Sequence, residues 1–335
     1  MLSCQKTPVL SVIIPVYNVG NYLSRCLESV IGQDFDAMEI IIVNDGSTDD
    51  SAAVIARYAA KDQRIIVVEK ENGGLVSARR TGLERASGKY VHHLDGDDYL
   101  ASGAYKTLIA KMEQEEADLL LFPFLFDYEG SGKQILSSPY DKAYYDSAEF
   151  LRACYTEKGY FAVWHYIHKR ALYDRGVDFN LNLSLGEDAY LTTQLGYYAN
   201  KIVSISDTPF LHYVIRPDSI TNQGFSEKKI ADFLLYPALI DAFLKDKPEY
   251  PLLGSAIASL KIHSLNNIVN AGYLADIRKN SEEAMILYGK YPELVKQRST
   301  KTYYKLYYLY HLNPLLGYLY SLYYKKKGKI KRIYY

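Results

Sequence analysis

Short apolar runs alternate with amphipathic segments over the first hundred positions of the chain. Four runs have the length and β-branched content of buried strands and end in polar turns. They lie within residues 10–18, 38–51, 64–71 and 89–98. Between them, apolar residues at spacings of three and four predict helices over residues 20–33, up to about residue 60, and within residues 73–87. This alternation predicts right-handed βαβ units, an α/β fold and a mainly parallel sheet covered by helices on both faces.

Polar groups follow three of these strands, at the edge where sheets of this class bind their ligands. Three carboxylates fall within four positions after the fourth strand, at Asp95, Asp97 and Asp98. Such charges repel one another, and a hard divalent cation relieves the repulsion. Mg²⁺ and Mn²⁺ need only one or two protein carboxylates when phosphate and water complete the shell. The pattern predicts a metal–diphosphate site, and a solvated acidic loop is the alternative.

Composition narrows the choice of function. The chain has 335 residues, 48% hydrophobic and 23% charged, with a formal net charge of zero, so nothing draws it as a whole to nucleic acid. Its three cysteines lie far apart, which argues against a disulfide framework and fits a reducing cytoplasm. The N-terminus resembles a first strand more than a signal peptide. The motifs GxxxxGK[ST] and GxGxxG are absent, which excludes a P-loop and a dinucleotide fingerprint.

The pattern becomes helical from about residue 225, and the composition changes again near residue 301. Residues 225–300 are expected to form a helical extension that packs on the rest of the chain or forms a homodimer. Residues 301–335 hold eight Lys or Arg, no Asp or Glu, and eleven of the 34 tyrosines. Tyrosines beside leucines at helical spacing, with a basic cluster after them, predict an amphipathic tail on an anionic membrane surface. Packing against protein and binding of RNA are the alternatives for this tail.

Four collinear segments carry a family resemblance: residues 12–30, 40–51, 72–98 and 185–191. Together they resemble the family 2 glycosyltransferases of GT-A fold, over about residues 8 to 220. The resemblance implies a catalytic domain at residues 1–224 that transfers a hexosyl or N-acetylhexosaminyl group with inversion. The implied donor is a nucleotide diphosphate sugar, usually a UDP-sugar. The implied acceptor is a glycan or lipid-linked hydroxyl of a cell-surface polysaccharide, glycolipid or glycoprotein. The cysteines and the basic tail together predict a cytoplasmic chain at the inner face of the cell membrane.

The resemblance also assigns roles to residues after the first four strands. Asp45 would hydrogen-bond the uracil, Asp95 would reach the ribose, and Asp97 would bind Mn²⁺ or Mg²⁺. Asp98 would position the metal or the acceptor. The other donor-binding positions are Pro15, Val16, Tyr17, Asn18, Gly46, Arg79 and Gly96. Arg80 stands where the family commonly has Asn, so an amide contact is not expected there.

Displacement at an anomeric carbon needs a base opposite the departing diphosphate. Glu187 and Asp188 follow Gly186 at the start of a predicted helix, where acids otherwise complement the helix dipole. The resemblance makes Asp188 the general base and Glu187 the residue that orients it or the acceptor.

Three further residues are candidates from the second half of the matched region. Trp164 would contact the acceptor, or pack in the core. Arg216 would pair with phosphate and His212 would approach the metal, or both would lie in an ordinary surface loop. A nucleotide-sugar-binding protein without turnover and a nucleotidyltransferase are the alternative functions.

Overall fold

The computed structural model describes residues 7–138, 140–156, 160–216, 226–270 and 277–298. The chain divides into two compact units. The first unit comprises Met1–Ser147, Ala162–Asn182 and Leu191–Pro217, and the second comprises Ala148–Phe161, Leu183–Tyr190 and Asp218–Tyr335. The segment boundaries expected at residues 224 and 300 stay predictions. The tail at residues 301–335 lies outside the described residues.

An eight-stranded sheet forms the centre of the first unit, in the order β3-β2-β1-β4-β10-β6-β11-β9. In that order the strands span Ile65–Lys70, Met38–Asp45, Leu10–Val16, Tyr90–His93, Tyr166–Lys169, Leu119–Leu121, Ile202–Ser204 and Tyr144–Tyr145. Strands β1 to β4 are parallel, which confirms the α/β prediction. Strand β10 runs antiparallel to both of its neighbours.

A four-stranded sheet completes the first unit, in the order β5-β12-β7-β8. These strands span Tyr99–Leu100, Leu211–Ile215, Phe124–Tyr128 and Lys133–Ser137. Strand β5 begins one residue after the acidic triplet and pairs with β12 through Tyr99 and His212. The second sheet therefore starts directly beside the candidate site.

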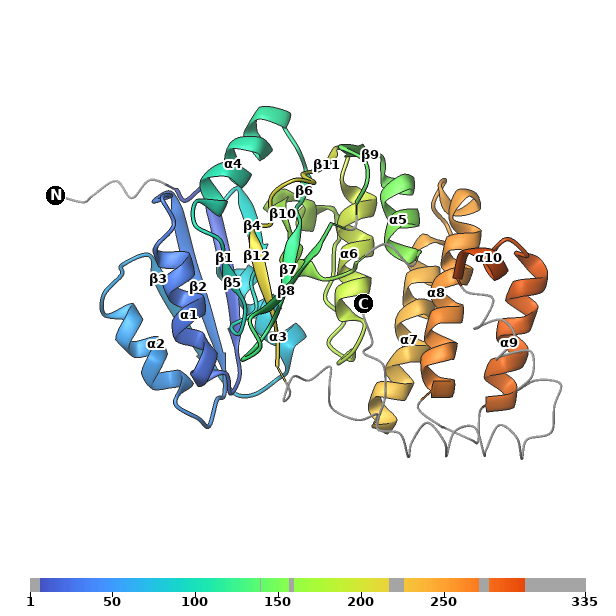
Figure 1. Ribbon diagram of the computed structural model, residues 1–335, viewed down its shortest axis with the longest axis horizontal. Helices are drawn as coiled ribbons and strands as arrows, with labels where there is room; N and C mark the ends of the chain where they lie inside the picture. Colours follow the sequence, from blue (N-terminus) through green and yellow to red (C-terminus); the bar gives the residue numbers. More distant parts are fainter. Residues whose placement is uncertain (1–6, 139, 157–159, 217–225, 271–276, 299–335) are drawn as a thin grey trace. The chain divides into compact units, whose positions relative to one another are not determined.

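Helices cover both faces of the parallel strands, as the sequence predicts. The helices of the first unit include α1 (Gly20–Ile31), α2 (Ser51–Ala59), α3 (Leu75–Arg85) and α4 (Ala104–Glu115). Ala78 of α3 packs against Ile13, Ile41 and Val43 on one face. Because side chains alternate along a strand, Val12 and its equivalents point to the other face. Helices α1 and α2 lie side by side over strands β1 to β3 (Figure 1).

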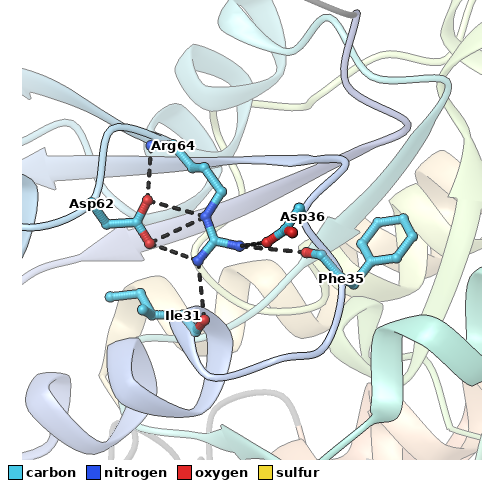
Figure 2. Close-up of polar contacts among 5 residues, drawn as sticks. All are labelled: Ile31, Phe35, Asp36, Asp62 and Arg64. Atoms are coloured by element: carbon cyan, nitrogen blue, oxygen red, sulfur yellow. Dashed lines mark hydrogen bonds and ion pairs between the residues drawn. The ribbon is translucent and has the colours of Figure 1, made fainter.

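Arg64 fixes the edge of the sheet where β2 and β3 begin (Figure 2). Its guanidinium donates to both oxygens of Asp62, to the Phe35 carbonyl at 3.4 Å and to the Ile31 carbonyl at 3.0 Å. It also pairs with Asp36 at 3.5 Å. Ile31 is the last residue of α1, so Arg64 satisfies a helix-end carbonyl that has no partner within its own helix. The anchored edge is the one opposite to the candidate site.

The second unit is largely helical, as expected for the C-terminal extension. Helices α7 (Glu227–Leu244), α8 (Tyr250–Asn270), α9 (Ile277–Lys290) and α10 (Leu294–Arg298) follow one another, and α5 (Ser147–Tyr155) joins them from earlier in the chain. Helix α6 (Glu187–Tyr198) crosses the division, which falls after Tyr190. The core between α8, α9 and α10 includes Ile262, Leu265, Ala284 and Leu294. Within the described ranges, no helix is both long and apolar enough to traverse a bilayer.

Gly82 lets α3 approach β1 closely, and this contact yields a prediction. A Cβ atom added at Gly82 would lie 2.3 Å from Cγ2 of Ile13 and 3.3 Å from Cγ2 of Val43. Gly82→Ala should therefore push helix and sheet apart and lower the free energy of unfolding by about 1–3 kcal/mol, measured by urea denaturation.

Gly289→Ala is the matched control, because Gly289 lies in α9 and an added Cβ meets nothing within 4 Å. Alanine there should raise the free energy of unfolding by about 0.5–1 kcal/mol, since glycine is the poorer helix former. Equal effects of the two substitutions on the free energy of unfolding would show that stability does not depend on the close approach of α3 to β1.

Candidate active site

The loops that follow β1 and β2 are tied to each other. Oδ1 of Asn18 accepts a hydrogen bond of 2.8 Å from the Thr48 amide, and the Asn18 amide donates to Oγ of Ser47 at 3.2 Å. The Val19 amide donates to Oγ of Ser51 at 3.1 Å. Asn18 has a φ of +52°, a conformation that asparagine tolerates better than most residues. Two of the three predicted strand ends thus form one rigid edge.

Asp45, the predicted uracil contact, ends β2 and is only 2% exposed. Its Oδ1 accepts from the Gly73 amide at 3.0 Å, and its Oδ2 accepts from the Gly74 amide at 2.8 Å. Nζ of Lys70 also donates to its Oδ1. The carboxylate therefore orders the loop before α3, and a nucleotide contact would use its remaining lone pairs.

Gly46 allows the loop before α3 to approach the end of β2 closely. Its φ is +71°, and an added Cβ would lie 2.9 Å from the Asn72 backbone nitrogen. Pro15 and Val16 lie in β1, with Val16 fully buried, whereas Tyr17 is 48% exposed. Tyr17 thus has side-chain surface available to a ligand.

Arginines compensate two of the three clustered carboxylates. Nη2 of Arg79 donates to Oδ1 of Asp95 at 2.9 Å, and Arg79 is only 2% exposed. Nε of Arg216 donates to Oδ2 of Asp97 at 2.9 Å. The Arg216 guanidinium also lies over the ring of Tyr22, 4.8 Å from its centroid. Arg79 and Arg216, both predicted to bind the donor, thus lie beside the acids of the same predicted site.

Asp98 has no exposed surface. Its Oδ1 accepts a hydrogen bond of 2.8 Å from the Val214 amide of β12, and its buried Oδ2 has no hydrogen-bond partner among the described residues. Burial and the neighbouring charges of Asp97 and Asp95 raise its pKa well above the usual value. Asp98 therefore links the end of β4 to the second sheet. Because its side chain is fully buried, it cannot contact an acceptor in this conformation.

The acids suit a particular kind of metal site. Burial and the charge of Asp95 raise the pKa of Asp97, and Arg216 opposes this rise. Within the described part of the chain, no group of three or more His, Cys, Asp or Glu side chains is arranged to hold a metal ion. The side chains of Asp95 and Asp97 are 23% and 21% exposed. Asp97, which keeps some exposed surface, fits a hard divalent ion that takes its other ligands from phosphate and water.

Gly96 packs tightly between these two acids. A Cβ added there would lie 3.2 Å from Cγ2 of Val19 and 3.3 Å from the Pro15 carbonyl oxygen. The acidic turn therefore lies directly against the end of β1. Of the predicted donor-binding residues, those after β1, β2 and β4 belong to the same unit and the same edge of its sheet.

His212, the second predicted metal ligand, contacts a different set of residues. Its ring stacks on Tyr99 at 4.2 Å between centroids, and its Nδ1 lies 4.0 Å from Oδ2 of Asp127 and 3.5 Å from Nε2 of Gln134. Burial lowers its pKa below the usual value. Its role as a metal ligand stays a prediction.

Trp164, the predicted acceptor contact, is 6% exposed. Its indole stacks on Tyr213 at 4.8 Å with an interplanar angle of 9° and meets Phe124 edge-on at 4.6 Å. The side chain has the placement of a core residue, the alternative that the sequence left open. Stacking of a sugar on its ring would require one of these neighbours to move.

Glu187 and Asp188 occupy the first turn of α6, as the sequence predicts. They belong to the second unit, whereas Asp45, Asp95 and Asp97 belong to the first. Gly186 before them has a φ of +78°, and its carbonyl accepts from the Tyr190 amide at 3.1 Å. The roles of Asp188 and Glu187 in catalysis stay predictions.

Sequence reasoning missed some contributors to the site. Lys70 and Tyr22 contact Asp45 and Arg216, respectively, yet the sequence assigned neither of them a role, because both look like ordinary strand and helix residues. The pairing of Arg216 with Asp97 joins residues 119 positions apart, so no local pattern signals it.

Comparison with known proteins identifies the family. The model of "Glycosyl transferase family 2" matches residues 11–179. The chain belongs to glycosyltransferase family 2.

The glycosyltransferase GlyA of Streptococcus pneumoniae is 34% identical over 220 residues, which are 63% of this chain and 31% of GlyA. The chain thus corresponds to about a third of that relative. Two solved structures share the fold. S. aureus TarS 1-349 in complex with UDP-GlcNAc has a TM-score of 0.67 at 20% identity, with 96% of this chain and 93% of that chain covered. The mannosyltransferase PcManGT of Pyrobaculum calidifontis, in complex with GDP-Man and Mn²⁺, has a TM-score of 0.56 at 17% identity, with 94% and 88% covered.

The burial of Asp98 yields a stability prediction. Asp98→Asn keeps an oxygen for the Val214 amide and removes the cost of burying an ionisable carboxyl group beside Asp97. We expect the free energy of unfolding at pH 8 to rise by about 1 kcal/mol in urea denaturation. Because the folded-state pKa of Asp98 lies above its unfolded value, the gain should shrink as the pH falls through that raised pKa and vanish below about pH 4.

Asp36→Asn provides the control, since the Asp36 side chain is fully exposed. It should change stability by less than about 0.5 kcal/mol at either pH. A loss of stability in Asp98→Asn at pH 8, or a gain independent of pH, would contradict the assigned cause.

Proposed function

We propose that this chain transfers a sugar from a UDP-sugar to a hydroxyl of a glycan or lipid-linked acceptor, with inversion at the anomeric carbon. The observation that carries the proposal is the compensated acid cluster: Asp95 with Arg79 and Asp97 with Arg216, at the carboxyl ends of parallel strands. Arginine–carboxylate pairs at such an edge are suited to exchange partners with a diphosphate. The nucleotide sugars held by TarS and PcManGT support the same donor class.

The residues of the first unit would bind the donor. Asp45 would receive the uracil N–H, with Tyr17 and the backbone of Pro15 and Val16 beside the base. Asp95 would accept from a ribose hydroxyl while Arg79 holds its carboxylate in place. Arg216 would turn from Asp97 toward the phosphates, which are the stronger anionic partner in the complex.

Asp97 is the residue that would hold Mn²⁺ or Mg²⁺, with His212 as a further predicted ligand. When bound there, the divalent ion supplies positive charge that stabilises the departing diphosphate. In its absence, Arg216 partly offsets the charge of Asp97.

Asp188 would take the proton from the acceptor hydroxyl as that oxygen attacks the anomeric carbon, and Glu187 would orient it. A carboxylate suits this task because it can be held ionised within hydrogen-bond reach of the hydroxyl. The attachment of residues 301–335 to an anionic membrane, which would bring a lipid-linked acceptor near, stays a prediction.

A donor screen tests the proposed function. Purified full-length chain is incubated with UDP- and GDP-sugars, with Mn²⁺ or with EDTA, and release of the nucleoside diphosphate is measured. We expect one UDP-sugar to release UDP in the presence of Mn²⁺, and we expect this release to stop when EDTA is added. Release of pyrophosphate would indicate nucleotidyl transfer, and binding of donors without any release would indicate a protein without turnover.

Asp188→Asn should separate binding from chemistry. The amide keeps the shape of the side chain but cannot accept a proton, so we expect kcat to fall about 10²- to 10⁴-fold. The donor Kd, measured by calorimetry, should stay within about twofold of the wild type, because the donor is bound by other residues. Transfer at the wild-type rate would refute the assignment of Asp188 as base.

Asp97→Asn should instead weaken binding of the donor. We expect UDP affinity in Mn²⁺ to fall at least about tenfold and to become insensitive to EDTA, because the charged ligand of the ion is lost. Asp36→Asn, a change of the same type at an exposed site, should leave both properties unchanged. Retention of the full metal dependence in Asp97→Asn would exclude Asp97 as a ligand.

A further inference from the structure

The loop that leads into α6 is held by the C-terminal helices. Leu183 and Leu185 are 3% and 9% exposed, so alternate residues of the loop are buried. Gly186 follows with a φ of +78° and ends the loop immediately before Glu187 and Asp188. The geometry of residues 183–186 therefore sets where the first turn of α6 begins.

Asp232 of α7 holds this loop through its carboxylate. The residue is 2% exposed, and its Oδ2 accepts hydrogen bonds from both the amide and the hydroxyl of Ser184, at 2.9 and 2.6 Å. Hydrogen bonds to a charged acceptor in a buried setting are stronger than those between neutral groups. A residue of the C-terminal extension thus fixes the backbone four positions before Asp188.

Tyr236 lies one turn further along α7 and packs on the same loop. A Cβ added at Gly186 would lie 2.3 Å from Cδ1 and 2.4 Å from Cγ of the Tyr236 ring. Since Asp232 and Tyr236 are four residues apart, they lie on the same face of the helix. On that face, Asp232 accepts hydrogen bonds from Ser184, and the Tyr236 ring packs against Gly186.

We infer that Asp232 and Tyr236 are positioning residues: α7 fixes the loop of residues 183–186 and thereby aims the Asp188 side chain. This inference rests on the proposed function only where it speaks of catalysis. A misplacement of the base by about 1 Å can lower a rate by up to about 10²-fold without affecting a substrate bound elsewhere. The C-terminal extension therefore contributes to turnover as well as to packing.

Asp241 provides a matched control on the same helix. Its carboxylate also accepts two hydrogen bonds, from Oη of Tyr250 at 2.8 Å and from Nζ of Lys261 at 2.6 Å, both residues of α8. Asp241→Ala therefore removes a comparable pair of contacts from α7 and leaves the Ser184 contacts intact.

The first measurement is hydrogen exchange of the full-length chain, which requires no activity. In Asp232→Ala, the amides of residues 184–190 should exchange at least about tenfold faster than in the wild type, because the Ser184 amide loses its acceptor and the following turn is released. In Asp241→Ala, exchange in this segment should match the wild type. Unchanged exchange in Asp232→Ala would overturn the inference.

The second measurement is steady-state kinetics with the donor found in the screen. Asp232→Ala should lower kcat about tenfold and leave the donor KM within about twofold of the wild type. Asp232→Asn should lower kcat less, because its amide oxygen can still accept hydrogen bonds from Ser184. Faster exchange with a kcat equal to that of Asp241→Ala would overturn the positioning role. If Asp188→Asn kept full activity, the proposed base would fail, and the exchange result would still decide whether α7 holds the loop.

A double-mutant cycle at Gly186 and Tyr236 tests the second contact. Gly186→Ala places a methyl group against the Tyr236 ring and should lower kcat strongly. The same change in a Tyr236→Ala background should cost at least about fivefold less, because only the strain at positive φ remains. Additive effects would contradict the contact as a determinant of the position of Asp188.

Discussion

Compensation of negative charge at the end of β4 is the constraint on which the site depends. Asp95, Asp97 and Asp98 follow a fully buried strand within four positions, where partial exposure of the first two and full burial of the third leave solvent little scope to relieve their repulsion. The chain offsets each one differently. Asp95 forms an ion pair with the buried Arg79, and Asp97 forms one with Arg216. Asp98 accepts a hydrogen bond from the Val214 amide, and its pKa is raised.

These partners come from distant parts of the chain, and this links the site to the fold. Arg79 lies in α3, while Arg216 and the Val214 amide belong to or follow β12 of the second sheet. The acidic turn therefore joins the two sheets of the first unit. A ligand that draws Arg216 away from Asp97 would alter both the charge of the site and the contact between the acidic turn and the end of β12.

Local patterns were sufficient to predict the parallel half of the fold and the edge where polar groups gather, because β1, β2 and β4 are apolar runs with polar turns at their ends. They did not predict that β10 inserts antiparallel between β4 and β6, since three-residue and four-residue strands carry little periodicity. Trp164 and Asp98 were expected at the acceptor, and both are buried through contacts with Tyr213 and Val214 that lie far away in sequence. Likewise, nothing in "LGEDAYL" signals that Asp232 and Tyr236 of α7 hold its start.

A crystal structure with UDP and Mn²⁺, with the metal located by its anomalous signal, would show whether Asp97 and Asp188 act on the same bound donor. We predict an anomalous peak within coordination distance of Asp97 and of a diphosphate oxygen, Arg216 turned toward phosphate, and the Asp188 carboxylate directed toward the bound nucleotide. A nucleotide bound on another surface, or an Asp188 carboxylate pointing away from the diphosphate, would contradict this prediction.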